Sequence, residues 1–218
     1  MTQLVKPKAI LFDWDNTLVD SWPVVHECFT HTLQFMNKKP WSLEEVKDRA
    51  HKSLNDSFPD IFGHRWQEAK DIFVKHFLKI RKHKTIPLAG AESLLNILYE
   101  NDIFMAVISN KMGEHLRQEV DALEWNKYFA ATIGANDAKN DKPSADVVHM
   151  ALSGSGILPG KDVWLIGDTL SDMECAHNSG CLAVFYGTFE PDKESAKFTP
   201  HLQVEDHQSL LQLINKYL

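Results

Sequence analysis

Five short runs of consecutive uncharged, mostly apolar residues constrain the fold of this chain more than any other feature. They are Ala9–Phe12, Ile103–Ile108, Ala131–Ile133, Val163–Ile166 and Leu182–Tyr186. Segments with apolar residues at helical spacing lie between most of them, as at Leu94, Leu95 and Leu98. Continuous apolar strands that alternate with amphipathic helices are typical of a parallel sheet covered on both faces. The sequence therefore predicts an α/β fold, a Rossmann-like core of three layers with the parallel sheet in the middle.

One stretch of the chain interrupts this alternation. After Asp20 no run has strand character until the second apolar run begins, and the residues between have helical patterns. The predicted helices cover residues 24–37, 42–52 and 65–83. Ser42 followed by Glu45 is a capping-box pattern that opens the second helix. Pro59 and Gly63 predict a break in regular structure before the third.

The length of the chain suits one large domain, or one domain with a small companion, because it has 218 residues. Since the helical stretch lies between the first and second strands, we expect it to fold as a separate small domain over residues 21–86. The α/β core is then discontinuous and consists of residues 1–20 and 87–218.

Charge and hydropathy exclude several classes of protein. The 23 basic and 30 acidic residues give a net charge of −7, whereas a general nucleic-acid surface needs clustered positive charge. The apolar runs are far shorter than the roughly twenty residues of a membrane span, and the polar first residues do not fit a secretory signal. We therefore expect a cytoplasmic protein without nucleic-acid or membrane partners, as a monomer or weak dimer.

The three cysteines, Cys28, Cys175 and Cys181, have no metal-type spacing and are odd in number. A disulfide scaffold is therefore not expected, and a reducing compartment is the default. Each cysteine is predicted to be a small buried apolar residue.

Polar side chains follow three of the predicted strands at the point where each strand ends, and a further loop carries a lysine before a proline. The residues are Asp13 and Asp15, then Ser109 and Asn110, then Asp168 and Asp172, with Lys142 in the loop. Ligands of open α/β sheets bind beyond the carboxyl ends of the strands. We therefore expect these side chains to converge in one crevice.

Four carboxylates in one crevice, from Asp13, Asp15, Asp168 and Asp172, would repel one another and an anionic substrate. A hard divalent cation removes this repulsion, and carboxylate oxygens with water and substrate phosphate are the ligands that Mg²⁺ prefers. Lys142 adds a fixed positive charge. The residues therefore predict a phosphate pocket built around Mg²⁺, with a small phosphorylated metabolite as the partner.

These residues fall into four ordered motifs that resemble those of the haloacid dehalogenase-like phosphohydrolase superfamily. The motifs are Asp13-Trp14-Asp15-Asn16-Thr17, Ser109, Lys142, and Gly167-Asp168 through Asp172. Their order and rough spacing agree over the whole core, and the helical insert resembles the α-helical cap of that family. The phosphoglycolate phosphatase-like enzymes are the most similar subgroup.

The resemblance implies a role for each aspartate of the first motif. Asp13 is the implied nucleophile, which forms an aspartyl-phosphate, and Asp15 is the implied general acid and base. Asp15 favours phosphate esters over halides, since an alkoxide leaving group needs a proton. Asn16 stands where glycine is commoner, and we expect it to keep the turn because asparagine tolerates a left-handed backbone.

The resemblance also implies a set of binding residues. The phosphate-binding residues are Ser109, Asn110, Lys142 and Thr17, and the Mg²⁺ ligands are Asp13, Asp168, Asp172 and the backbone carbonyl of Asp15. Substrate choice is expected to lie in the cap, where we single out Arg49, His51 and Lys52 for their position and charge. Phosphoglycolate is the substrate that the subgroup resemblance favours.

Alternative interpretations remain for both the protein and single residues. A sugar phosphate mutase of the β-phosphoglucomutase type would use the same two aspartates, and a silent binding or regulatory protein could keep the fold without turnover. Taken alone, Asp168 and Asp172 could be a helix N-cap and a first-turn acid, Lys142 a solvated loop residue, and Ser109 a partner of loop backbone.

Overall fold

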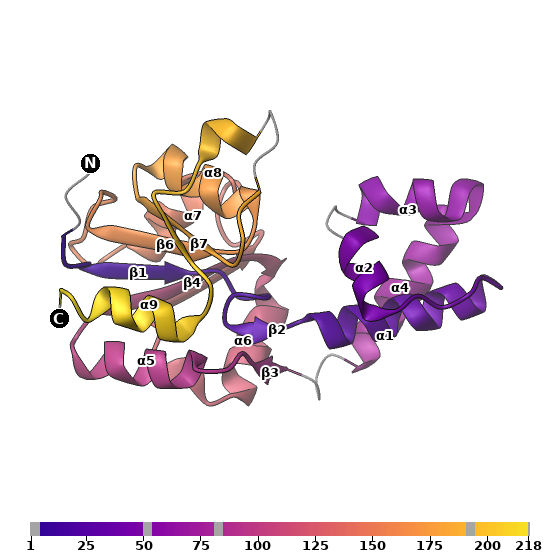
Figure 1. Ribbon diagram of the computed structural model, residues 1–218, viewed down its shortest axis with the longest axis horizontal. Coiled ribbons are helices and arrows are strands. Elements are labelled where there is room, and N and C mark those ends of the chain that lie inside the picture. The colour runs from indigo at the N-terminus through magenta and orange to yellow at the C-terminus, as the bar shows by residue number, and fades with distance from the viewer. Residues whose placement is uncertain (1–4, 50–53, 81–84, 191–194, 218) are drawn as a thin grey trace. The chain divides into compact units, whose positions relative to one another are not determined.

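The structure is a computed structural model that describes residues 5–49, 54–80, 85–190 and 195–217. The chain divides into two compact units, which can be followed in Figure 1 by their residue numbers. The α/β unit is formed by Met1–Val19 with Pro87–Leu218, and the helical unit is formed by Asp20–Ile86. No helix of the described residues is both long and apolar enough to cross a bilayer.

The α/β unit contains a six-stranded sheet in the order β5-β4-β1-β6-β7-β8. Its strands are β1 (Ala9–Phe12), β4 (Phe104–Met112), β5 (Ala131–Ala135), β6 (Val163–Gly167), β7 (Leu182–Tyr186) and β8 (Leu202–Val204). All neighbouring strands in this sheet pair in parallel. The chain moves outward from β1 to β5 on one side and then returns to β6 on the other. The β1 strand is therefore at the topological switch point, where such sheets bind ligands.

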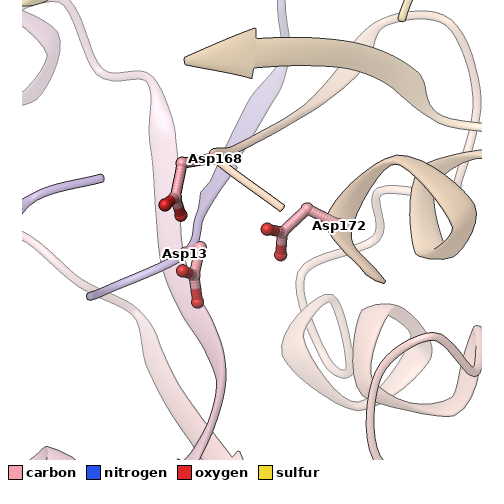
Figure 2. A group of neighbouring side chains, drawn as sticks. All are labelled: Asp13, Asp168 and Asp172. Carbon is pink, nitrogen blue, oxygen red and sulfur yellow. The ribbon is translucent and has the colours of Figure 1, made fainter. Parts of the chain in front are cut away.

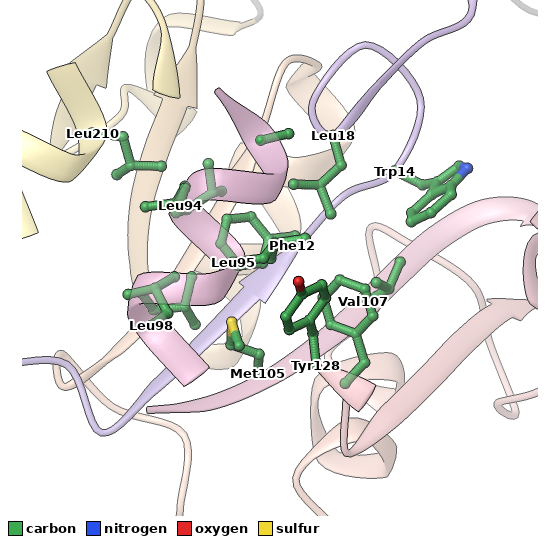
Figure 3. Packing of buried hydrophobic residues seen from close by; sticks show 14 of the residues in the cluster. Phe12, Trp14, Leu18, Leu94, Leu95, Leu98, Met105, Val107, Tyr128 and Leu210 are labelled. Atoms are coloured by element: carbon green, nitrogen blue, oxygen red, sulfur yellow. The ribbon is translucent and has the colours of Figure 1, made fainter. Parts of the chain in front are cut away.

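Alternate residues of the four central strands, β4, β1, β6 and β7, enter two separate hydrophobic cores. Ile10 and Phe12 of β1 pack with helices on one face, and Ala9 and Leu11 pack with helices on the other. The first face carries α5 (Ala91–Glu100), α6 (Gly113–Ala122) and α9 (His207–Ile214), and the second carries α7 (Asp146–Ala151) and α8 (Leu170–Ser179). Figure 3 shows the first core, with Leu95 of α5 against Phe12. The predicted parallel sheet between two helical layers is confirmed.

The helical unit has a hydrophobic core of its own. Its helices are α1 (Trp22–Phe35), α2 (Leu43–Arg49), α3 (Leu54–Phe62) and α4 (Trp66–Ile80), with a 3₁₀ turn at Gly63–Arg65. Phe29 of α1 contacts the rings of Phe58 and Phe73, which come from α3 and α4. Since all three rings are buried, each contributes about 1.5–3 kcal/mol of apolar burial.

Several predicted element boundaries are confirmed. The β1 and β7 strands have the predicted bounds, and Ser42 and Glu45 form the predicted capping box through two reciprocal hydrogen bonds of 2.8 and 3.2 Å. All three cysteines are buried free thiols, as expected. The predicted helices 42–52 and 65–83 are seen as far as Arg49 and Ile80, and their last residues lie outside the described ranges.

The prediction that Pro59 interrupts regular structure is wrong, because Pro59 lies inside α3. A proline removes one backbone donor, but the neighbouring side chains of Phe58 and Phe62 are buried in the core of the helical unit. Their packing keeps the helix continuous across the proline.

Some short elements were not predicted at all. The β2 (Val19–Asp20) and β3 (Ile86–Pro87) strands pair with each other in a separate two-stranded sheet. The β8 strand and the 3₁₀ turns at Trp125–Lys127 and Ser195–Phe198 complete the described elements.

Candidate active site

Three carboxyl groups converge at the carboxyl ends of β1 and β6, as Figure 2 shows. Asp13 directly follows β1, Asp168 directly follows β6, and Asp172 lies in the first turn of α8. One oxygen of each carboxyl lies within 4.8 Å of the others. They meet because β1 and β6 are paired neighbours, in register from Ala9 with Val163 onward.

Lys142 connects two of these carboxyls from a loop between β5 and α7. Its Nζ atom donates to Asp13 Oδ1 at 2.7 Å and to Asp172 Oδ1 at 2.6 Å. The lysine side chain is only 3% exposed, so its charge is held inside the protein. Burial opposes that charge, but the two carboxylates outweigh burial and raise the pKa of Lys142 well above its usual range. Lys142 is therefore not a solvated loop residue.

Burial and mutual repulsion disturb the acids of this cluster. Burial, with the nearby Asp172 carboxylate, raises the pKa of Asp13 to about 6 even though Lys142 opposes the shift. Burial and the charges of Asp13 and Asp172 raise the pKa of Asp168 to about 8. Crowded acids that resist ionisation are the donor set that a hard divalent cation stabilises. The residues present therefore fit the predicted Mg²⁺.

Asp172 has structural contacts through both of its oxygens. Its Oδ1 atom accepts from Lys142, and its Oδ2 atom accepts from the backbone N–H and the hydroxyl of Thr169, at 3.0 and 2.5 Å. Thr169 is the N-cap of α8 and forms a capping box with Asp172. The alternative interpretation as a first-turn acid is therefore correct for Asp172, which at the same time supports Lys142.

The other predicted phosphate-binding residues surround this cluster with varied contacts. Ser109 is buried, and its hydroxyl accepts from the N–H of Lys111 at 3.2 Å. The amide of Asn110 donates to the carbonyl of Lys142 at 3.1 Å. Thr17 is fully buried and donates to Asp168 Oδ1 at 3.3 Å. These contacts tie the loops of the site together, while binding of phosphate by these three residues stays a prediction.

The backbone of the first motif has the turn that the sequence predicts. Asn16 has a φ of 57°, in the left-handed region, which asparagine tolerates better than most residues. The N–H of Asn16 donates to the carbonyl of Val19 at 2.7 Å. The turn returns the chain toward β2 directly after Asp15.

Asp15 contacts Lys111, a residue to which the four motifs assign no role. Lys111 Nζ donates to Asp15 Oδ1 at 2.8 Å and to Glu119 Oε2 at 2.6 Å. Lys111 follows Ser109 and Asn110 in sequence, where pairing of β4 with β5 changes register. Glu119 is a buried acid on α6, a helix with no recognised motif. The one signal in the sequence is a glutamate at helical spacing with the apolar residues Leu116 and Val120.

The predicted specificity residues belong to the helical unit. Arg49 is exposed, with its guanidinium 4.6 Å from the centre of the Trp41 ring and 3.7 Å from Glu45. It lines a cavity of about 550 Å³ together with Lys38 and Lys39, among other residues. The other two predicted residues, His51 and Lys52, lie outside the described residues.

The chain is similar to several known proteins. A pyrophosphatase PpaX from Listeria welshimeri is 25% identical over 211 residues, which cover 96% of this chain and 97% of that protein. A phosphoglycolate phosphatase from Pseudomonas fluorescens is 25% identical and covers 94% of this chain and 79% of its own length. A crystal structure of a haloacid dehalogenase superfamily hydrolase from Ehrlichia chaffeensis is 30% identical, covers 98% of both chains and superposes with a TM-score of 0.68.

The chain also matches the profile of a whole family. The profile of haloacid dehalogenase-like hydrolases matches residues 10–185, which include all four motifs and the helical unit. The resemblance predicted from the motifs is thereby confirmed, and the protein belongs to the haloacid dehalogenase-like hydrolase family of enzymes.

Proposed function

We propose that this enzyme is a Mg²⁺-dependent phosphatase that acts on a small phosphorylated compound through an aspartyl-phosphate. The observation that carries the proposal is the contact of Lys142 with Asp13, next to Asp168 and Asp172, at the switch point of the sheet. This arrangement offers a nucleophile, a fixed cation and acidic metal ligands within one small volume. Phosphoryl transfer depends mainly on such positioning and charge stabilisation.

The reaction proceeds in two steps on the proposed residues. A carboxylate oxygen of Asp13 attacks phosphorus, the bond from phosphorus to the leaving oxygen breaks, and Asp15 gives that oxygen a proton. Water then attacks the phosphorus of the aspartyl-phosphate, Asp15 takes a proton from the water, and the Asp13 carboxylate is released. Lys142 holds Asp13 and faces the charge of the transferring group.

The proposed Mg²⁺ ligands are Asp13, Asp168 and the backbone carbonyl of Asp15. Asp172 supports them, because both of its oxygens already accept hydrogen bonds. Bound there, the ion would neutralise the charge of the phosphoryl oxygens and of the crowded acids. The raised pKa values of Asp13 and Asp168 support this assignment, because both acids gain from a cation.

Two substrates deserve direct comparison. Phosphoglycolate is favoured by the subgroup resemblance and by the relative named phosphoglycolate phosphatase. Inorganic pyrophosphate is favoured by the relative named pyrophosphatase, whose match covers 96% of this chain. The two differ in leaving group, because phosphoglycolate releases an alkoxide that needs a proton, whereas pyrophosphate releases a phosphate that needs little help.

The helical unit is proposed to act as the cap that chooses between substrates, with Arg49, His51 and Lys52 as candidates for contact with a substrate anion. Arg49→Ala and Lys52→Ala should each lower kcat/KM on the best substrate. Unchanged kcat/KM in both variants would remove these residues from the proposal.

The test of the function is phosphate release from phosphoglycolate, pyrophosphate, hexose phosphates and nucleoside monophosphates, with and without Mg²⁺. Release that needs Mg²⁺ and is lost in Asp13→Asn is the expected result. Conversion of a hexose 1-phosphate to the 6-phosphate without net phosphate release would instead indicate the mutase. No reaction with any compound would favour a silent protein.

A further inference from the structure

Lys111 joins the first motif to helix α6 in the interior of the α/β unit. Its Nζ atom lies 2.8 Å from Asp15 Oδ1 and 2.6 Å from Glu119 Oε2. The side chains of Lys111 and Glu119 are only 10% and 7% exposed, whereas that of Asp15 is 31% exposed. The lysine thus reaches from the interior to the one partly open carboxyl of the motif.

A second contact holds Glu119, the buried member of the group formed by Asp15, Lys111 and Glu119. The indole N–H of Trp14 donates to the same Glu119 Oε2 atom at 2.8 Å. Trp14 is fully buried, and its ring packs edge-on against Trp125 at 5.8 Å between centroids. Glu119 therefore restrains Trp14, the residue before Asp15, directly. It also restrains the Asp15 side chain through Lys111.

The charges of the group make the contacts mutually dependent. Burial opposes the charge on Lys111, but Asp15 and Glu119 outweigh burial and raise the pKa of Lys111. Removal of one partner from a buried ion pair leaves an uncompensated charge, which is strongly destabilising. Without the lysine, two carboxylates would face each other and separate.

We propose that Lys111, anchored by Glu119, is a positioning residue that holds the Asp15 carboxyl in the orientation for proton transfer to the leaving oxygen. This inference rests on the proposed function, because Asp15 is the acid and base of that reaction. It concerns a residue outside the four motifs on which the function is proposed. Lys142 contacts the nucleophile in the same way, so each aspartate of the motif has its own lysine.

The test compares substrates that need proton transfer to different extents. Kinetics of Lys111→Met, Lys111→Arg and Glu119→Gln are measured with p-nitrophenyl phosphate and with phosphoglycolate, at saturating Mg²⁺. In Lys111→Met, kcat/KM on the alkyl ester, which reports the steps up to enzyme phosphorylation, should fall at least ~10-fold, part of the effect of a general acid. With the nitrophenyl ester, kcat/KM should change little, because this leaving group needs little proton transfer, and Lys111→Arg should recover part of the loss on the alkyl ester.

Controls separate positioning from simple instability. Lys127→Met removes an exposed lysine elsewhere in the α/β unit and should leave both activities unchanged. If Lys111→Met does not fold, Glu119→Gln keeps the lysine and loosens its anchor, so the same substrate selectivity should appear at a smaller size. Equal loss of kcat/KM on both esters, or no loss on either, would overturn the proposal.

Failure of the proposed function has a different signature. In that case wild-type protein releases no phosphate from either ester or from pyrophosphate. The positioning proposal is then decided by crystal structures of wild type and Lys111→Met, in which the Asp15 carboxyl should turn away only in the variant. An unchanged Asp15 side chain would overturn it.

Discussion

Asp13 and Asp15 lie two residues apart but have different surroundings. Asp13 is buried, contacts Lys142, and has a pKa raised to about 6, chiefly by burial. Asp15 is partly exposed and contacts Lys111. Two carboxyls placed in different environments can perform different roles in one reaction. At this scale the enclosed acid suits the nucleophile, and the more open acid suits exchange of protons with substrate and water.

Asp15→Asn should separate substrates by their leaving groups. The amide keeps the shape of the side chain but cannot donate the proton, so kcat for phosphoglycolate should fall about 10²–10⁴-fold. The rate of enzyme phosphorylation by pyrophosphate should fall much less, because phosphate is a good leaving group. Rapid-quench kinetics on both compounds would measure this, and equal falls in the phosphorylation rate would argue against Asp15 as the acid.

Asp13 and Asp168 are predictable from the sequence because each directly follows a strand end, and parallel neighbours bring such positions together whatever the details of packing. Lys142 is predictable because its loop follows β5 at the same edge of the sheet. Lys111 and Glu119 could not be assigned a role in the same way. Their contacts depend on how α6 packs against the sheet and on the change of register within β4, which residue patterns do not specify.

The first turn of α8 is the element that connects helix capping to the site. Thr169→Ala removes the hydroxyl that donates to Asp172, which in turn contacts Lys142. Loss of an N-cap side chain should cost about 1 kcal/mol of stability. Because Asp172 loses a donor, kcat should fall as well, by about 10-fold, which is typical of residues that orient a ligand.

A matched variant distinguishes these two effects. Asp206 caps α9 with the same kind of capping box, through Ser209, but far along the chain from the motifs. Asp206→Ala should cost a similar free energy of unfolding, measured by denaturant titration, with kcat unchanged. A fall of kcat in both variants would show that capping acts only through general stability.

Elements were predictable where they are long and regular in pattern. The core strands are apolar along their whole length, and helices such as α5 have apolar residues at helical spacing, so their existence follows from hydropathy. Strands β2, β3 and β8 are two or three residues long, too short for any periodic signal. The sequence does not predict helix α3, because its proline favours a break in regular structure, whereas the packing of Phe58 and Phe62 that keeps the helix continuous is tertiary.

The acidic cluster should make the free energy of unfolding of the protein depend on pH. Asp168 and Asp13 bind protons more tightly in the folded protein, since burial raises their pKa values to about 8 and about 6. For a carboxyl whose pKa is raised on folding, the folded state loses stability as the pH rises from the ordinary value to the raised one. In the metal-free protein, the contribution of Asp13 and Asp168 to the free energy of unfolding therefore falls between about pH 4 and about pH 8.

Mg²⁺ should reverse that loss. Saturation at about 100 times its Kd adds about 2.7 kcal/mol by mass action, and the gain in Tm should be larger near pH 8 than near pH 5, where protons compete for the same oxygens. Thermal unfolding with Mg²⁺ or a chelator at both pH values would measure it, with Asp168→Asn as the comparison. An equal Mg²⁺ effect at both pH values, or none, would contradict the proposed ligands.

Asp13 should carry the phosphoryl group during turnover. The direct measurement uses Asp15→Asn, Mg²⁺ and pyrophosphate, since this leaving group needs little acid while the second step lacks its base. After acid quenching, peptide mass spectrometry should find a phosphoryl group on Asp13, absent when Asp13 is also changed to asparagine. Phosphate release at the wild-type rate with no phosphoenzyme, or a phosphoryl group on a different residue, would contradict the account.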